Sequence, residues 1–131
     1  AAYDPRVRTR ISSGMAVTGP EFLAIQRRRA EMIARARVLY AGLDGFILPT
    51  SPLVPPPITA LAQDADYARI NFLSLRNTFI GNFLDGCAIS LPMTPAGAAP
   101  AGLMLMGPHG ADQRLFAAAA ALETALSQLK K

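Results

Sequence analysis

Side chains that could act as nucleophiles occur at Ser51, Ser90 and Cys87. A serine nucleophile needs a neighbouring base, and the sequence holds one histidine, His109, with Asp112 three residues later. No Gly-x-Ser-x-Gly segment surrounds either serine, and His109 stands among glycine and proline residues that favour an exposed turn. We therefore expect no Ser-His-Asp triad in this chain.

Other familiar kinds of site are also missing. Cys87 lies in an apolar run, where a thiol usually behaves as an inert, small hydrophobic group. One histidine and one cysteine far apart do not form a transition-metal site, and no glycine-rich phosphate-binding pattern is present. The only lysines are Lys130 and Lys131. We expect no metal, no cofactor and no complete catalytic set within these residues.

Polar residues gather on one expected helix, which begins near Asp64 or Asp66. Asparagine is a mediocre helix former, so its repeated use there indicates hydrogen-bonding roles. These side chains either satisfy the end of the helix or form the polar wall of a pocket, and the sequence leaves both alternatives open. The polar residues are Asn71, Arg76, Asn77, Thr78 and Asn82.

The elements that must position these residues follow from apolar patterning. Short apolar runs at 45–48, 87–91 and 102–106 predict buried strands. A helix capped by Thr18 and Glu21 ends at Gly42, and further helices are expected over the polar stretch and after Asp112. This order predicts a single α/β unit, 1–131, with a sheet covered on both faces. Residues 1–17 are expected to be mostly extended or irregular.

Arg29 falls on the apolar stripe of the first expected helix. It either extends its charged end toward solvent or pairs with a carboxylate elsewhere. Residues 54–58 contain consecutive prolines and predict an extended connector.

Composition narrows the class of protein. Hydrophobic residues make up 51% and charged residues 17% of 131 residues, which is too apolar for disorder. No apolar run approaches the roughly 20 residues of a membrane span, and we expect no membrane partner. The net charge of +4 comes without aromatic stacking motifs, so we expect no nucleic acid partner.

The single cysteine favours a reducing compartment such as the cytoplasm. The start at Ala1, without methionine, fits an excised or processed fragment, and the high apolar content predicts a homo-oligomer.

Several patches, in order along nearly the whole chain, resemble the C-terminal part of an amidase signature family enzyme. Many family members have proline at the position of Cys87, and enzymes of the biuret and allophanate hydrolase type are more similar there. The patches are residues 3–11, the arginine-rich helix leading to 46–52, residues 75–78 with Asn82, residues 86–92, and residues 100–107 followed by Asp112.

This resemblance implies a mixed sheet layered with three main helices, and hydrolysis of carboxylic or urea-type amides. It implies a Ser–cis-Ser–Lys triad on a glycine- and serine-rich segment and an upstream lysine, neither of which this chain contains. The chain would then be roughly the last quarter to third of an amidase, inactive alone, with the N-terminal remainder as its partner. A non-catalytic interaction or oligomerisation domain of the same fold is the alternative. The resemblance implies contacts with a small-molecule amide substrate from Thr50, Arg76, Asn77, Phe79, Asn82 and Cys87.

Overall fold

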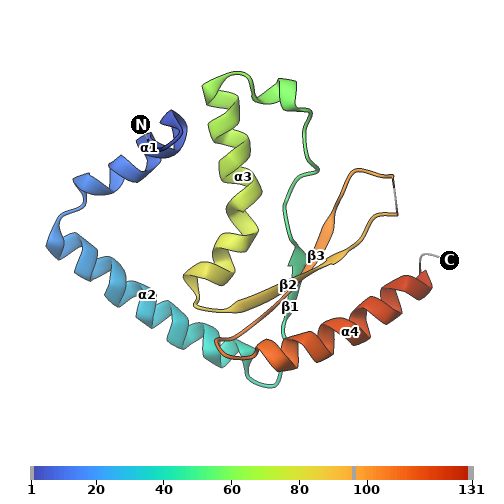
Figure 1. Ribbon diagram of the computed structural model, residues 1–131. Helices are drawn as coiled ribbons and strands as arrows, with labels where there is room; N and C mark the ends of the chain where they lie inside the picture. Colours follow the sequence, from blue (N-terminus) through green and yellow to red (C-terminus); the bar gives the residue numbers. More distant parts are fainter. Residues whose placement is uncertain (1, 96, 130–131) are drawn as a thin grey trace.

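The computed structural model describes residues 2–95 and 97–129 (Figure 1). Ala1 and the two lysines, Lys130 and Lys131, lie outside the described residues. The α-helices are α1 (Pro5–Ser12), α2 (Gly19–Tyr40), α3 (Asp64–Phe83) and α4 (Asp112–Leu129), and two short 3-10 helices are η1 (Ser13–Ala16) and η2 (Ile58–Leu61). The strands are β1 (Phe46–Pro49), β2 (Cys87–Pro92) and β3 (Gly102–Gly107).

The three strands form one sheet in the order β1-β3-β2. Leu105 at its centre lies opposite Ile47 on one side and Ile89 on the other, and both pairings are antiparallel. The α/β class is confirmed. The resemblance implied a mixed sheet, but the described strands show antiparallel pairing alone. Strands β1 and β2 are parallel to each other, but β3 lies between them and pairs with both.

One face of the sheet packs against α4. Leu115 and Ala119 of the helix meet Leu91 of β2 and Leu105 of β3, and all four side chains are buried. Alternate residues of a strand point to opposite faces, so Cys87 and the other odd-numbered residues of β2 contribute to this side. This cluster is the apolar core of the described structure.

The opposite face of the sheet packs against α3. Gly81 lies against the even-numbered residue Met106, and a Cβ atom added at Gly81 would come within 3.2 Å of the Met106 sulfur. The buried Asn77 side-chain amide donates to the Pro49 carbonyl at 2.7 Å, which ties α3 to the end of β1. Figure 1 shows the sheet between α3 and α4, so its expected covering on both faces is confirmed.

Helix α2 begins with the expected capping box. The Thr18 amide and hydroxyl both donate to the Glu21 carboxylate, at 2.9 and 2.7 Å, and these hydrogen bonds lower the pKa of Glu21 from its ordinary value. The apolar stripe expected to bury α2 does so only near the C-terminal end, at Ala36 and Tyr40. Burial raises the pKa of the Tyr40 hydroxyl, which has no hydrogen-bond partner among the described residues.

Arg29 contacts α3 rather than a carboxylate. Its Nε donates to the Phe83 carbonyl at 2.8 Å and its Nη2 to the Asn82 carbonyl at 3.2 Å. The last carbonyls of a helix lack partners within the helix and carry partial negative charge, which a guanidinium complements. Arg29 thereby joins α2 to the C-terminal end of α3.

The prediction of an irregular N-terminus is wrong, since α1 and η1 occupy most of it. The Asp4 carboxylate accepts from the Arg6 amide at 2.8 Å, and Pro5 stands in the first turn, where it is well tolerated. The Asp-Pro start and the four-residue spacing of Val7 and Ile11 are the local signals for this helix, which is only eight residues long. Arg6 then pairs with Asp64 at 2.6 Å and stacks over the Tyr67 ring at 4.4 Å, which docks α1 beside the start of α3.

Large apolar side chains remain exposed on α2 and α3. Phe72 is 79% exposed and Phe79 60% exposed, although both are of the size that usually forms a core. Among the described residues, no helix is both long and apolar enough to cross a membrane. The other exposed large apolar side chains on the two helices are Phe22, Leu23, Ile25, Met32, Val38, Leu39, Leu75 and Ile80.

Candidate functional site

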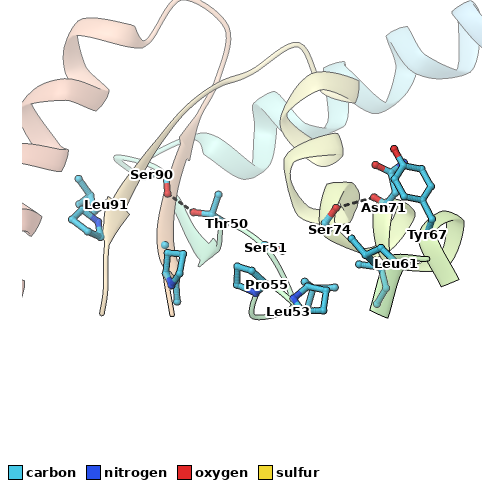
Figure 2. Close-up of a pocket in the computed structure, with 16 residues that line it drawn as sticks. Thr50, Ser51, Leu53, Pro55, Leu61, Tyr67, Asn71, Ser74, Ser90 and Leu91 are labelled. Carbon is cyan, nitrogen blue, oxygen red and sulfur yellow. Dashed lines mark hydrogen bonds between the residues drawn. The ribbon is translucent and has the colours of Figure 1, made fainter. Parts of the chain in front are cut away.

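A pocket of about 610 Å³ opens between the connector after β1, the N-terminal half of α3 and the ends of β2 and β3. Figure 2 shows its walls, which come from segments far apart in the sequence. Leu53, Pro55 and Leu61 form an apolar side. The extended connector expected over residues 54–58 has no helix or strand at 54–57 and is extended at Pro57, but Ile58 already begins η2. The volume lies within the range of ordinary small-molecule sites.

Two hydroxyl groups meet at the sheet end of the pocket. The Oγ1 of Thr50 and the Oγ of Ser90 lie 2.5 Å apart (Figure 2), and the Thr50 amide donates to the Gly102 carbonyl at 2.8 Å. A Cβ atom at Gly102 would collide with both hydroxyl oxygens, so glycine is what lets them meet across the end of β3. One hydroxyl donates to the other, which leaves one hydrogen and several lone pairs for a third group.

Further polar groups of the pocket lack partners. The buried Oγ of Ser51 has no hydrogen-bond partner among the described residues. Asn71 also lines the pocket, and its side-chain amide makes no hydrogen bond to another described residue, whereas the Ser74 hydroxyl is occupied by the Asn71 carbonyl at 2.9 Å. A few polar groups converging in a mostly apolar cavity are typical of a ligand site.

The part of α3 that lines the pocket is its N-terminal half, whereas most of the polar residues noted in the sequence lie in its C-terminal half. Tyr67, Ile70, Asn71 and Ser74 face the pocket, at the spacing of one helix face. Of the polar residues singled out on this helix, the pocket lining contains only Asn71. The helical spacing of these four residues could have indicated a shared face. Sequence periodicity detects stripes of apolar residues, however, and this face combines apolar and polar side chains.

The six residues implied by the resemblance are not brought together. Thr50 lines the pocket, whereas Asn77 does not and instead donates to the carbonyl of Pro49, the residue before Thr50. Arg76 is exposed, and its Nε donates to the Asn77 Oδ1 at 3.3 Å. No ion pair joins Arg76 to another residue in the described ranges.

The remaining three lie elsewhere. Phe79 stacks on Phe83 with ring centroids 5.9 Å apart on an exposed face of α3, and Asn82 is exposed near the same helix end. Cys87 faces α4, on the other side of the sheet, and its thiol donates to the Pro108 carbonyl at 3.3 Å.

The serine, histidine and aspartate residues do not form a triad. His109 follows the end of β3 opposite the pocket, and a strand of six residues spans roughly 17 Å. Its Nδ1 lies 3.4 Å from the Asp85 carboxylate, and its side chain is largely exposed. The described residues also contain no group of three or more metal-ligating side chains.

Comparison with known proteins identifies the relatives of this chain. The chain is 35% identical over 129 residues to the 2-amino-5-chloromuconic acid deaminase of Comamonas testosteroni, covering 95% of this chain and 27% of that protein. It is 33% identical to a glutamyl-tRNA(Gln) amidotransferase subunit from Thermus thermophilus, covering 79% of this chain and 21% of that protein. No solved structure matches the chain significantly.

The chain thus spans about a quarter of the length of the curated relatives that it matches. The amidase family model matches residues 2–116, which includes every strand and most of the helical residues. The resemblance noted in the sequence is therefore confirmed, and the chain belongs to the amidase family.

Proposed function

We propose that this chain is the C-terminal part of an amide hydrolase whose Ser–cis-Ser–Lys triad lies in an upstream part of the same protein. The proposal rests on the family match, which extends over most of this chain. The chain itself spans only about a quarter of the length of its relatives. One relative is named a deaminase and another is named as part of an amidotransferase, and both names refer to chemistry at a nitrogen substituent. Cytoplasmic location is part of the proposal, on the ground of the single cysteine.

The upstream catalytic part is the proposed partner of the exposed faces of α2 and α3. Apolar patches of this extent are uncommon on free monomeric domains and usually mark an interface. On the exposed face of α3, Arg76 and Asn82 accompany Phe79, and a polar pair set among apolar side chains suits a substrate cleft at such a junction. Arg76 would hold a carboxylate or carbonyl oxygen of the substrate.

Asn77 and Cys87 are proposed to act as positioning residues. Asn77 holds α3 against the residue that precedes Thr50, and Cys87 holds β2 against the turn at Pro108.

The test uses the full-length enzyme and a panel of primary amides, with ammonia release as the readout. Full-length protein should release ammonia, whereas the 131-residue chain alone should not. Arg76→Ala and Asn82→Ala should each lower kcat/KM by about tenfold to a hundredfold, with thermal unfolding unchanged. Arg28→Ala, an exposed change on α2, is the matched control. Full-length protein without amidase activity would refute the proposal, and wild-type kcat/KM in both variants would refute the assignment of these residues.

A second candidate function is that of a non-catalytic interaction or oligomerisation domain. The exposed apolar faces favour it as well, because a second copy could cover them. Light scattering on the full-length protein separates the roles: a dimer or higher oligomer supports self-association, and a monomer excludes it. Amide hydrolysis together with a monomeric mass leaves only the enzymatic role.

A further inference from the structure

We propose that the 610 Å³ pocket is a substrate subsite for an uncharged group that both donates and accepts hydrogen bonds, such as a carboxamide or an alcohol. The inference rests on the proposed amide hydrolysis and names the class of substrate. Thr50, Ser90, Ser51 and Asn71 supply the contacts. The group that they hold is an end of the substrate other than the amide that is cleaved.

The absence of charge in the lining carries the first step. Within residues 2–95 and 97–129, every residue that lines the pocket is apolar, hydroxyl-bearing or an amide. A carboxylate or ammonium group placed there would lose part of its hydration without gaining an opposite charge, which is unfavourable. Arg6 stacks behind Tyr67, but it does not line the pocket and is already paired with Asp64.

The hydrogen-bonding capacity of the pocket carries the second step. The Thr50–Ser90 pair has one hydroxyl hydrogen left to donate and lone pairs left to accept. The buried Ser51 oxygen and the Asn71 amide add a further unpaired hydroxyl and an amide that offers both donor and acceptor. A buried polar group without a partner is unfavourable, so a ligand that satisfies several of them at once is selected over an apolar one.

The lack of a base near these hydroxyls carries the third step. Among the described residues, no lysine or histidine lines the pocket, and His109 lies beyond the far end of β3. Without a base the hydroxyls of Thr50, Ser51 and Ser90 are not activated as nucleophiles. They are therefore suited to binding a group of the substrate and not to cleaving it.

The test compares matched amides on the full-length enzyme. Succinamide, glutaramide and adipamide carry a neutral carboxamide at the second end, and succinamate, glutaramate and adipamate carry a carboxylate in its place. Butyramide, valeramide and hexanamide end in a methyl group. We expect kcat/KM for the best diamide to exceed that of its carboxylate counterpart by at least about tenfold. A preference for the carboxylate would overturn the proposal, and this comparison needs no variant.

Thr50→Val and Ser90→Ala remove one hydroxyl each while keeping most of the side-chain volume. Each should lower kcat/KM for the best diamide by about fivefold to twentyfold, with a change within about twofold for the methyl-ended amide. Thr50→Ser should restore the diamide activity. Thr124→Val and Ser127→Ala are the matched controls, since these hydroxyls donate to backbone carbonyls of α4. Equal losses on diamides and methyl-ended amides, or no loss on either, would overturn the proposal.

Calorimetric binding separates failure of this inference from failure of the proposed function. Binding of succinamide, glutaramide and adipamide to the full-length protein is measured without turnover, against the three corresponding carboxylates. Protein that releases no ammonia yet binds a diamide in a manner abolished by Thr50→Val would retain the subsite and lose the proposed enzymatic role. Protein that hydrolyses amides but binds diamides and carboxylates equally would lose the subsite alone.

Discussion

The two sides of the molecule differ in how completely the chain covers them. On the α4 side, Leu115 is 3% exposed and Ala119 2% exposed, and they pack on β2 and β3. On the outer side of α2 and α3, Phe72 and Phe79 lie mostly in the open. Because both sides present large apolar side chains, residue type does not explain why one side is buried and the other is exposed.

The difference shows which contacts the chain can complete by itself. Helix α4 follows β3 after a short turn and folds back on the sheet, so its apolar stripe meets strands close in sequence. Helices α2 and α3 present apolar residues on more than one face, and the sheet accounts for only one face of α3. The first side is complete within this chain, and we infer that the second awaits the proposed catalytic part.

The largest expected effect comes from the complete side. Leu115→Ala should lower the free energy of unfolding of the full-length protein by about 3 kcal/mol, because it removes a buried side chain from a close-packed cluster. Chemical denaturation measures the loss. Leu126→Ala, nearer the end of the same helix and only half-buried, should show a smaller loss. A loss below about 1 kcal/mol for Leu115→Ala would indicate that α4 is not packed as described.

The second effect concerns the link between α3 and the sheet. Asn77→Ala removes a buried side chain and its part-buried hydrogen bond to the Pro49 carbonyl, and should destabilise the full-length protein by about 2 kcal/mol. Asn82→Ala, an exposed change on the same helix, should leave the unfolding free energy within about 0.5 kcal/mol. Thermal and chemical unfolding of both variants check this contrast. Equal stability of the two would show that the Asn77 bond is not what holds α3.

The third effect tests how α2 is joined to the rest. Arg29→Ala removes two hydrogen bonds to the last carbonyls of α3 and should reduce stability by about 1 kcal/mol. The neighbouring exposed Arg28→Ala should change stability by less than about 0.5 kcal/mol. Amide hydrogen exchange should also quicken at the end of α3 in the Arg29 variant. Unchanged exchange there would mean that α2 is held mainly by contacts of another kind.

The smallest effect concerns the Tyr40 hydroxyl. Because burial raises its pKa, the folded state keeps the proton at a pH where the unfolded chain has lost it, so stability falls as pH rises above about 10. Tyr40→Phe should flatten this decline. At neutral pH it should be neutral or stabilising by up to about 1 kcal/mol, since the hydroxyl has no partner among the described residues. Denaturant titrations at neutral and alkaline pH check both points, and a clear destabilisation at neutral pH would reveal a partner for the hydroxyl.

Elements whose signals lie within a few residues of one another could be predicted from the sequence alone. The Thr18–Glu21 capping box, the three apolar strand runs and the α4 stripe each depend on residues a few positions apart, and the structure confirms them. Resemblance of ordered patches determined the family. The N-terminal helix has local signals as well, the Asp4-Pro5 start and the four-residue spacing of Val7 and Ile11, but it is only eight residues long and its docking depends on Arg6 meeting Asp64 across a long stretch of chain.

Which polar residues share a site depends on how the strands and helices pack in three dimensions. Thr50 and Ser90 are forty residues apart in sequence and meet only because β3 lies between their strands and Gly102 has no side chain to separate them. The same packing gives Asn77 a backbone partner and turns Cys87 to the α4 side. Strand order and side-chain facing depend on long-range pairing, and residue type and local spacing contain no record of that pairing.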